Sequence, residues 1–336
     1  MSRPFKLGFM LRIPTVDQGG SVEAVYRDAL DLAVAADQLG FDSLWVTQHH
    51  FGGVDSSLPS PLVFLAAVAA RTTRIRLGTT IITASLEHPI RLAEDIATLD
   101  VLSSGRVEVG LGTSSSELER QVFGVAAGDQ RGLLHETAHQ LVNAWKGRPV
   151  GGHADAVVQP HRPTLADRVW LATITRAHAL FAAEHGFGLI TNYRPSSLTP
   201  DNAGYLDDYN AIGSRTGAAP RIAMSRGVFP SADREAARRL LMPHAIRFVD
   251  RGTRLGWLPS SCTPDDFFTR EDFHYGHPEE VVASLRDDPG LPYASELLTG
   301  MLSARIPPRD LIPTMERIAI DVAPALGWRP QPAVLN

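Results

Sequence analysis

The stretch from Arg74 to Ser116 constrains the fold more than any other part of the chain. Two short apolar, β-branched runs, at 75–82 and 107–111, are separated by a helical pattern that stops at the Ser-Ser-Gly of 103–105. Apolar runs without alternation are typical of strands buried on both faces. A strand, a helix and a second such strand form a βαβ unit, whose strands run parallel with a right-handed crossover. This region therefore predicts a parallel sheet covered by helices.

The same alternation of strand and helix continues along nearly the whole sequence. Further strand-like runs occur at 5–11, 43–47, 169–172, 188–191, 222–229 and 295–302, each with a helical pattern after it. The total of about eight strand and helix pairs predicts an α/β fold of the (β/α)8 TIM-barrel type, with insertions in its βα loops. Such barrels reach this length as one unit, so we expect residues 1–336 to form a single domain. A doubly wound open sheet is the competing architecture, but no G-x-G-x-x-G follows the first strand.

Residues 250–277 interrupt this alternation. The segment is too long for an ordinary connection, which leaves an active-site cover or local disorder as its interpretation. Its aromatic content favours a cover, because disordered segments seldom hold so many aromatic side chains. The aromatic residues are Trp257, Phe267, Phe268, Phe273 and Tyr275.

Charge and cysteine content exclude several classes of function. The formal net charge is −5, and no basic stripe is present that could bind nucleic acid. The single cysteine, Cys262, allows no internal disulfide and no cluster of thiolate zinc ligands. No apolar run is long enough to cross a membrane, and the chain enters its first strand without a signal peptide. We expect a cytoplasmic protein with no membrane partner.

Candidate catalytic residues follow the second strand. In such a barrel, functional residues lie at the carboxyl ends of the strands, where His49 and His50 occur. Neighbouring residues of an extended chain point to opposite sides, so only one of the two can face the barrel axis. That histidine could act as a general base or a hydrogen-bond donor near neutral pH. A structural histidine bonded to a nearby carbonyl is the alternative from position alone.

Hydroxyl-bearing loops after later strands offer an anion site. Ser114 and Glu117 fit the capping box S-x-x-E, so free backbone N–H groups and hydroxyls would meet where a phosphate could bind. Helix capping alone explains this spacing equally well. Arg131 could supply a cation to the same phosphate. Further donors after the fifth strand are Thr173, Thr175 and His178.

One motif favours different chemistry. Residues 135–139, His-Glu-Thr-Ala-His, match H-E-x-x-H, which on a helix can bind zinc and activate a water molecule. A zinc hydrolase also needs a third ligand, and no histidine or glutamate follows at a characteristic interval. The helix also falls where a barrel has its outer layer. Chance occurrence is the better interpretation, and no metal is expected.

Several motifs together resemble the bacterial luciferase-like flavin-dependent monooxygenases. They are Phe41-Asp-Ser-Leu-Trp-Val-Thr-Gln-His-His-Phe51, His88-Pro89 with Leu92-Ala-Glu-Asp95, Leu99-Asp-Val-Leu-Ser-Ser-Gly-Arg106, Gly110-Leu-Gly112, Ala182-Ala-Glu-His-Gly186 and the helix beginning at Pro278-Glu-Glu280. The similarity extends over nearly the whole chain. The motifs are specific to the superfamily and not to a substrate.

The resemblance implies a (β/α)8 barrel that binds reduced FMN, lets O2 add at flavin C4a and shields the resulting (hydro)peroxide while a small organic substrate is oxygenated. It implies that His49 is the catalytic histidine, with His50 beside it. Thr79, Thr80 and Ile81 match a third-strand bulge under the isoalloxazine, which often contains a non-prolyl cis peptide. Matches to phosphate contacts are Ser115, Arg131, Thr175 and His178, with Thr173 adjacent.

Three departures from the family pattern also affect the expected cofactor site. Gln48 stands where a glutamate is common, Thr113 where luciferases have a phosphate-binding arginine, and His178 where Ser or Thr is usual. Losing that arginine removes a charge-assisted bond, so FMN is expected to bind weakly.

The resemblance also bears on partners and alternatives. No nicotinamide fingerprint is present, so a separate flavin reductase is expected to supply reduced FMN. The superfamily also contains F420-dependent oxidoreductases, which remain an alternative, and flavin-binding members without catalysis. Small apolar faces at 61–70 and 91–102 suggest a homodimer.

Overall fold

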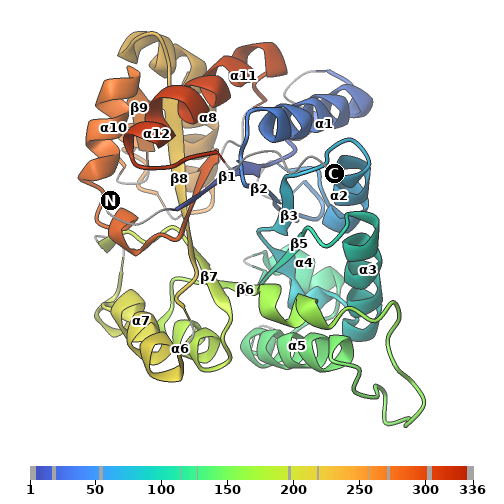
Figure 1. Ribbon diagram of the computed structural model, residues 1–336. Coiled ribbons are helices and arrows are strands. Elements are labelled where there is room, and N and C mark those ends of the chain that lie inside the picture. Colours follow the sequence, from blue (N-terminus) through green and yellow to red (C-terminus); the bar gives the residue numbers. More distant parts are fainter. Residues whose placement is uncertain are drawn as a thin grey trace.

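The computed structural model describes residues 5–16, 20–52, 56–114, 116–126, 128–195, 198–217, 219–256, 258–270, 273–300 and 305–330. Eight parallel strands close into a barrel at its centre (Figure 1). They are β1 (Lys6–Leu11), β2 (Ser43–Val46), β3 (Arg76–Thr79), β5 (Val107–Gly112), β6 (Val169–Ala172), β7 (Gly188–Thr191), β8 (Ile222–Pro230) and β10 (Glu296–Gly300). The ring closes where β10 pairs with both β1 and β8. This confirms the predicted (β/α)8 fold and the parallel βαβ unit.

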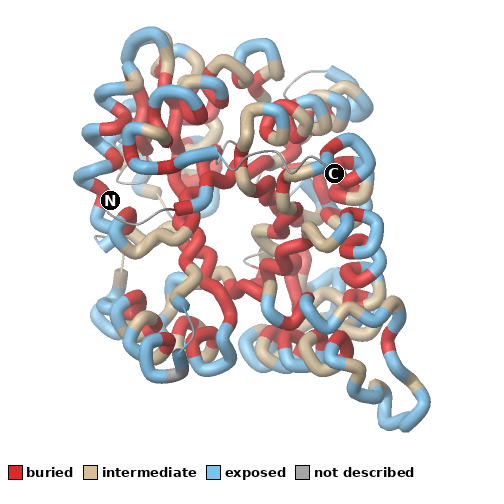
Figure 2. Tube along the Cα trace, in the orientation of Figure 1, coloured by how far each residue is buried: buried red, intermediate tan, exposed pale blue. Residues whose placement is uncertain are grey.

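Helices surround the strands on the outside of the ring (Figure 1). They are α1 (Val22–Gln38), α2 (Pro61–Ala69), α3 (Pro89–Leu102), α4 (Glu117–Val122), α5 (Gln130–Trp145), α6 (Arg176–Glu184), α7 (Tyr205–Thr216), α8 (Arg234–Arg254), α9 (Pro264–Phe267), α10 (Pro278–Arg286), α11 (Pro308–Arg317) and α12 (Ala323–Ala325). Figure 2 shows buried residues along the strands and along the helix faces that pack on them. Within the described residues, none of these helices combines the length and hydropathy needed to cross a bilayer.

The barrel interior is filled by a small apolar cluster that is separate from the larger core between strands and helices. It consists of Trp45, Trp170, Ile190, Ala223 and Leu298. The rings of Trp45 and Trp170 meet edge to face at 5.5 Å. Each indole N–H donates to a buried carboxylate, Trp45 to Glu296 at 2.8 Å and Trp170 to Glu108 at 2.7 Å. These hydrogen bonds fix the orientation of the two indole rings, so the cluster forms a rigid apolar layer inside the barrel.

The segment 250–277 contains more regular structure than its sequence suggests. Helix α8 continues to Arg254, α9 follows, and residues Phe273–Gly276 form β9, which pairs in parallel with the end of β8. Its phenylalanines lie in the core: Phe267 is 1% exposed and Phe268 6%. The run Phe-His-Tyr-Gly of β9 shows neither alternation nor a β-branched residue, which is why no strand was expected there.

Candidate functional site

His49 lies just beyond β2, at the carboxyl end of the barrel. Its backbone N–H donates to Leu58 O at 2.9 Å, and its side chain is partly buried. Burial, reinforced by the positive charges of Arg12 and Arg251, lowers the pKa of His49 from 6.5 to about 3. The imidazole is therefore neutral at physiological pH, and it can accept a proton or donate the one it carries.

His50 occupies a different environment from its neighbour. Its ring packs edge to face on Phe123 at 4.8 Å, and its backbone N–H donates to Glu119 Oε1 at 2.9 Å. The Nε2 atom of His50 is buried without a hydrogen-bond partner among the described residues. A buried nitrogen of this kind usually has a partner, so a ligand group at this place would satisfy it.

The expected capping box of Ser114 and Glu117 is wrong. Helix α4 is capped by Ser116, whose Oγ accepts from the N–H of Glu119 at 3.2 Å. The Ser114 hydroxyl instead donates to the Glu119 carboxylate, which also holds the N–H of His50. Because Glu119 turns back toward β2, Ser114 ties this loop to the histidine pair instead of capping the helix.

Gln48 is buried and fully engaged in hydrogen bonds. Its Nε2 donates to Glu87 Oε1 at 2.9 Å and to Pro59 O at 3.1 Å, while its Oε1 accepts from the N–H of Thr83 at 2.7 Å. Gln48 therefore fixes the loops that follow β2 and β3. A glutamate here could not donate to Glu87, so the glutamine matches its neighbours.

Thr79 is the last residue of β3, and Thr80 and Ile81 follow it directly. The Thr79 hydroxyl both accepts from Gly110 N and donates to Gly110 O at 2.9 Å, which locks β3 to β5. The peptide between Thr80 and Ile81 is cis, as the resemblance implied. Ile81 packs on the apolar cluster inside the barrel, and a Cβ on Gly112 would lie 2.8 Å from Ile81 Cγ1. Glycine at 112 thus allows Ile81 to pack closely against the end of β5.

Four predicted binding residues gather across the mouth. Thr173 Oγ1 accepts from the N–H of Thr175 at 2.8 Å, and Thr175 is the N-cap of α6, which bears His178. Burial, with the nearby His135 and the charge of Arg131, lowers the pKa of His178 to about 4. These residues offer hydroxyl, imidazole and guanidinium donors. Thr113 is exposed, and Ser115 lies outside the described residues.

The histidines of the H-E-x-x-H motif pack against α6. His135 Nε2 lies 3.2 Å from His178 Nδ1, and its ring stacks on Phe181 at 3.6 Å. His139 packs on His185 at 4.5 Å between ring centroids. In the part of the chain that the structure describes, no three potential ligand side chains are grouped to hold a metal ion.

Sequence reasoning missed two arginines whose charges act on His49, and a buried histidine on which the same arginines act. Arg12 follows β1, while His244 and Arg251 lie on α8 and are 3% and 8% exposed. Burial, with the charges of Arg12 and Arg251, lowers the pKa of His244 to about 3, so the same two guanidiniums act on both histidines. Side chains alternate along a strand, and Gly8 and Met10 face the barrel interior, so Arg12 could have been expected to face inward as well. No local pattern in the sequence indicates that residues of α8 lie near this histidine.

The fold is a (β/α)8 TIM barrel with histidine, hydroxyl and guanidinium side chains at its carboxyl end. The sequence model of the luciferase-like monooxygenase family matches residues 7–295. The chain belongs to this family.

Relatives within the family carry out more than one chemistry. The monooxygenase RslO1 from Streptomyces bottropensis superposes with a TM-score of 0.81 at 26% identity, covering 96% of this chain and 100% of that one. The oxygenase component of the flavin-dependent trigonelline monooxygenase of Acinetobacter baylyi is 31% identical over 42% of this chain and 40% of its own. An F420-dependent glucose-6-phosphate dehydrogenase of Kineococcus radiotolerans is 36% identical over 34% of this chain and 36% of its own. The chain spans about half the length of the first curated relatives it matches.

Proposed function

We propose that this protein is the oxygenase component of a two-component, FMN-dependent monooxygenase acting on a small organic molecule. The observation that carries the proposal is that His49 and the donors of Thr175, His178 and Arg131 lie at one end of a barrel of this family. The similarity to RslO1, a monooxygenase, over 96% of the chain supports oxygenation. F420-dependent relatives also match, one of them 36% identical over 34% of the chain, which makes hydride transfer with F420 the second candidate.

The residues at the mouth fit a flavin. Ile81, which packs on the apolar cluster and against Gly112, would give a flat ring a floor. The unpartnered Nε2 of His50 can bond to a polar edge of a ring. Arg131, Thr175 and His178 carry the donor types that bind a phosphate. Gln48 and Thr79 would hold the strand ends and loops around the flavin in place.

Reduced FMN, when bound, supplies the electrons that reduce one atom of O2 to water while the other enters the substrate. Neutral His49 would take up or give a proton at an imidazole nitrogen as the substrate reacts. Segment 250–277 would cover the mouth. Its aromatic residues Phe267 and Phe268 would support that cover from the core instead of lining the pocket.

The lack of a nicotinamide-binding motif in the sequence favours a separate reductase partner. No nicotinamide fingerprint is present in the sequence, and the trigonelline relative is itself named an oxygenase component. We propose that a separate flavin reductase supplies reduced FMN. The protein purified without added flavin should then lose FMN readily; tight retention would contradict weak binding.

The test is a comparison of cofactors followed by isotope labelling. Reduced FMN and reduced F420 are titrated anaerobically against the protein, with fluorescence of its tryptophans as readout. The protein is then supplied with NADH, a flavin reductase, 18O2 and a panel of small organic compounds. One 18O atom in a product supports the proposal. Binding of F420 with no binding of FMN would replace it with the second candidate.

A further inference from the structure

The first histidine of the H-E-x-x-H motif contacts a residue that we propose to bind the flavin phosphate. His135 Nε2, on α5, lies 3.2 Å from Nδ1 of His178, on α6. The His135 ring also stacks on Phe181, about one turn further along α6, with 3.6 Å between the ring centroids and 1° between the ring planes. Two residues of α6 therefore hold His135, and its hydrogen bond in turn orients the ring of His178.

The hydrogen bond joins two neutral rings. Burial and the charge of Arg131 lower the pKa of His135, and burial, with His135 and Arg131, lowers the pKa of His178 to about 4. A neutral histidine carries a proton on only one ring nitrogen, so one ring donates and the other accepts. If His135 donates, both rings carry the proton on Nε2, which is the tautomer that a free neutral histidine prefers. The reverse direction would require a proton on Nδ1 of both rings.

The direction of this bond decides what His178 can offer to an anion. With its proton on Nε2, His178 has a donor at that atom; with the proton on Nδ1, the Nε2 atom carries a lone pair that a phosphate would repel. Among the described residues, His135 is the only hydrogen-bond partner of the His178 ring, so its Nε2 is available to a ligand. Because hydrogen bonds in a chain polarise one another, the bond from His135 also strengthens the donor at Nε2.

Other donors lie close to this pair. Helix α6 begins at Arg176, and its N-cap Thr175 makes no side-chain bond to the first turn. The N–H of Arg176 donates to Asn202 Oδ1 at 2.9 Å, which leaves the next two N–H groups for an anion. Arg131 precedes His135 by four residues on α5, so both side chains lie on the same face of that helix.

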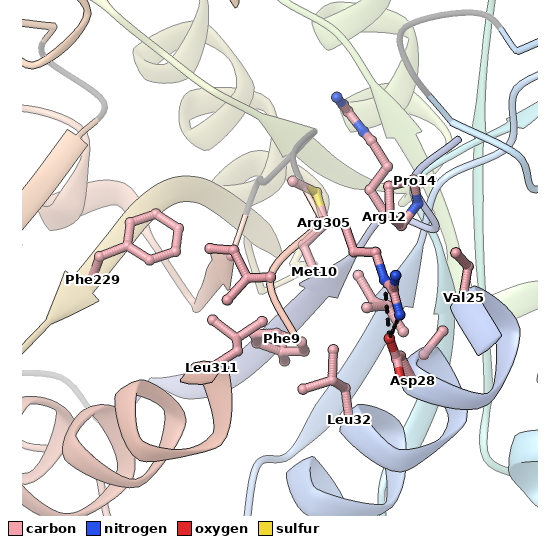
Figure 3. A pocket seen from close by; sticks show the side chains of 14 residues that line it. Phe9, Met10, Arg12, Pro14, Val25, Asp28, Leu32, Phe229, Arg305 and Leu311 are labelled. Atoms are coloured by element: carbon pink, nitrogen blue, oxygen red, sulfur yellow. Dashed lines mark hydrogen bonds and ion pairs between the residues drawn. The ribbon is translucent and has the colours of Figure 1, made fainter. Parts of the chain in front are cut away.

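Another pocket with arginines in its lining is a poorer place for the phosphate. It lies between β1, α1 and α11, and its wall is mostly apolar (Figure 3). Its Arg305 is paired with Asp28, with 2.7 Å between Nη2 and Oδ2. The Arg12 side chain points away from this pair in Figure 3. A phosphate in this pocket would have to displace a carboxylate, so the groups on α5 and α6 form the better site.

We propose that His135 is a positioning residue of the flavin phosphate site, which donates to Nδ1 of His178 and thereby directs the Nε2–H of His178 to the phosphate. The inference rests on the proposed function, because it concerns the phosphate of the same flavin. It gives the first histidine of the H-E-x-x-H motif a role that requires no metal.

The experiment compares FMN with riboflavin, which lacks the phosphate, in fluorescence titrations of the full chain. His135→Phe can still stack on Phe181 but cannot donate, so it should weaken FMN about fivefold and leave riboflavin unchanged. His135→Gln, which keeps an N–H donor, should retain most of the affinity for FMN. His139, on the next turn of α5, packs on Phe181 and His185, and His139→Phe is the matched control that should change neither constant.

A double variant separates positioning from packing. In a His178→Phe protein, adding His135→Phe should cause no further loss of FMN affinity, because no ring nitrogen remains to be oriented. A further loss in that background would overturn the inference. The 15N NMR signals of the ring nitrogens need no variant: His178 should be protonated at Nε2 and not at Nδ1, and the reverse would also overturn it.

The two proposals can fail separately. If the wild-type protein does not bind FMN, the proposed function fails. If it binds FMN but His135→Phe leaves FMN unchanged, or weakens FMN and riboflavin equally, the role of His135 is overturned while the function stands. Selective loss of FMN affinity in His135→Phe, with recovery in His135→Gln, supports both.

Discussion

The low pKa of His49 makes the folded protein sensitive to acid in a way that can be calculated. An unfolded chain has a histidine pKa near 6.5, and the folded value of His49 is about 3. Between these two values the unfolded state binds a proton that the folded state does not, so stability falls as the pH falls below 6.5. At pH 5.0 the loss relative to pH 7.5 is about 2 kcal/mol, from 1.5 pH units at about 1.4 kcal/mol each.

The assay is urea unfolding at pH 7.5 and pH 5.0, followed by tryptophan fluorescence. Between these pH values, the wild-type protein should lose about 2 kcal/mol more of its free energy of unfolding than His49→Asn, which has no group to protonate. His153 is exposed, so His153→Asn should behave like the wild type and serves as the control. Equal losses in the wild type and His49→Asn would show that His49 is not held neutral by burial and by Arg12 and Arg251.

Three further predictions concern the cofactor, the core and the assembly. Arg131→Met should weaken FMN about fivefold but leave riboflavin, which lacks the phosphate, unchanged in fluorescence titrations, as expected for an exposed charge pair; equal weakening of both would remove Arg131 from the phosphate site. Asp288 is buried, bonded by Arg226 and by Gly290 N at 2.7 Å, so Asp288→Asn should cost about 3–5 kcal/mol in urea unfolding, against under about 1 kcal/mol for the exposed Asp95→Asn; a cost below 1 kcal/mol would contradict the role of this pair. Val63 and Leu102 are 73% and 65% exposed on α2 and α3, so if these faces join two subunits, the double change to Glu should halve the mass measured by light scattering, while Leu255→Glu, just after α8, should not; a monomeric wild type would contradict the expected dimer.

The barrel could be predicted from the sequence because its strands are buried on both faces, and such strands consist of short runs of apolar residues. The loops at their carboxyl ends could be predicted in the same way, which placed His49 and His178 at one end. The contacts within those loops could not. Ser114 and Ser116 both precede a glutamate at capping distance, and the position of the Glu119 carboxylate decided between them.

Contacts between distant segments account for the rest of what the sequence did not show. Arg12 and Arg251 are far apart in the chain, and only the closed ring brings them to the same histidine. The sequence likewise could not show what surrounds the H-E-x-x-H motif. In the structure, His135 lies against His178 on the next helix. Strand β9 adds to the end of β8 without a pattern of its own, since its four residues are all buried.

The central claim is that the carboxyl end of this barrel binds reduced FMN above Ile81, close to Trp45 and Trp170. The most direct measurement is an anaerobic titration of the protein with reduced FMN, monitored by the fluorescence of these tryptophans in the wild type and in Gly112→Leu. A Cβ at 112 would lie 2.8 Å from Ile81 Cγ1, so a leucine there would force Ile81 out of the position in which it supports the ring. The account predicts saturable quenching in the wild type at one FMN per chain and its loss in a folded Gly112→Leu protein. Equal quenching in both proteins, or none in the wild type, would contradict it.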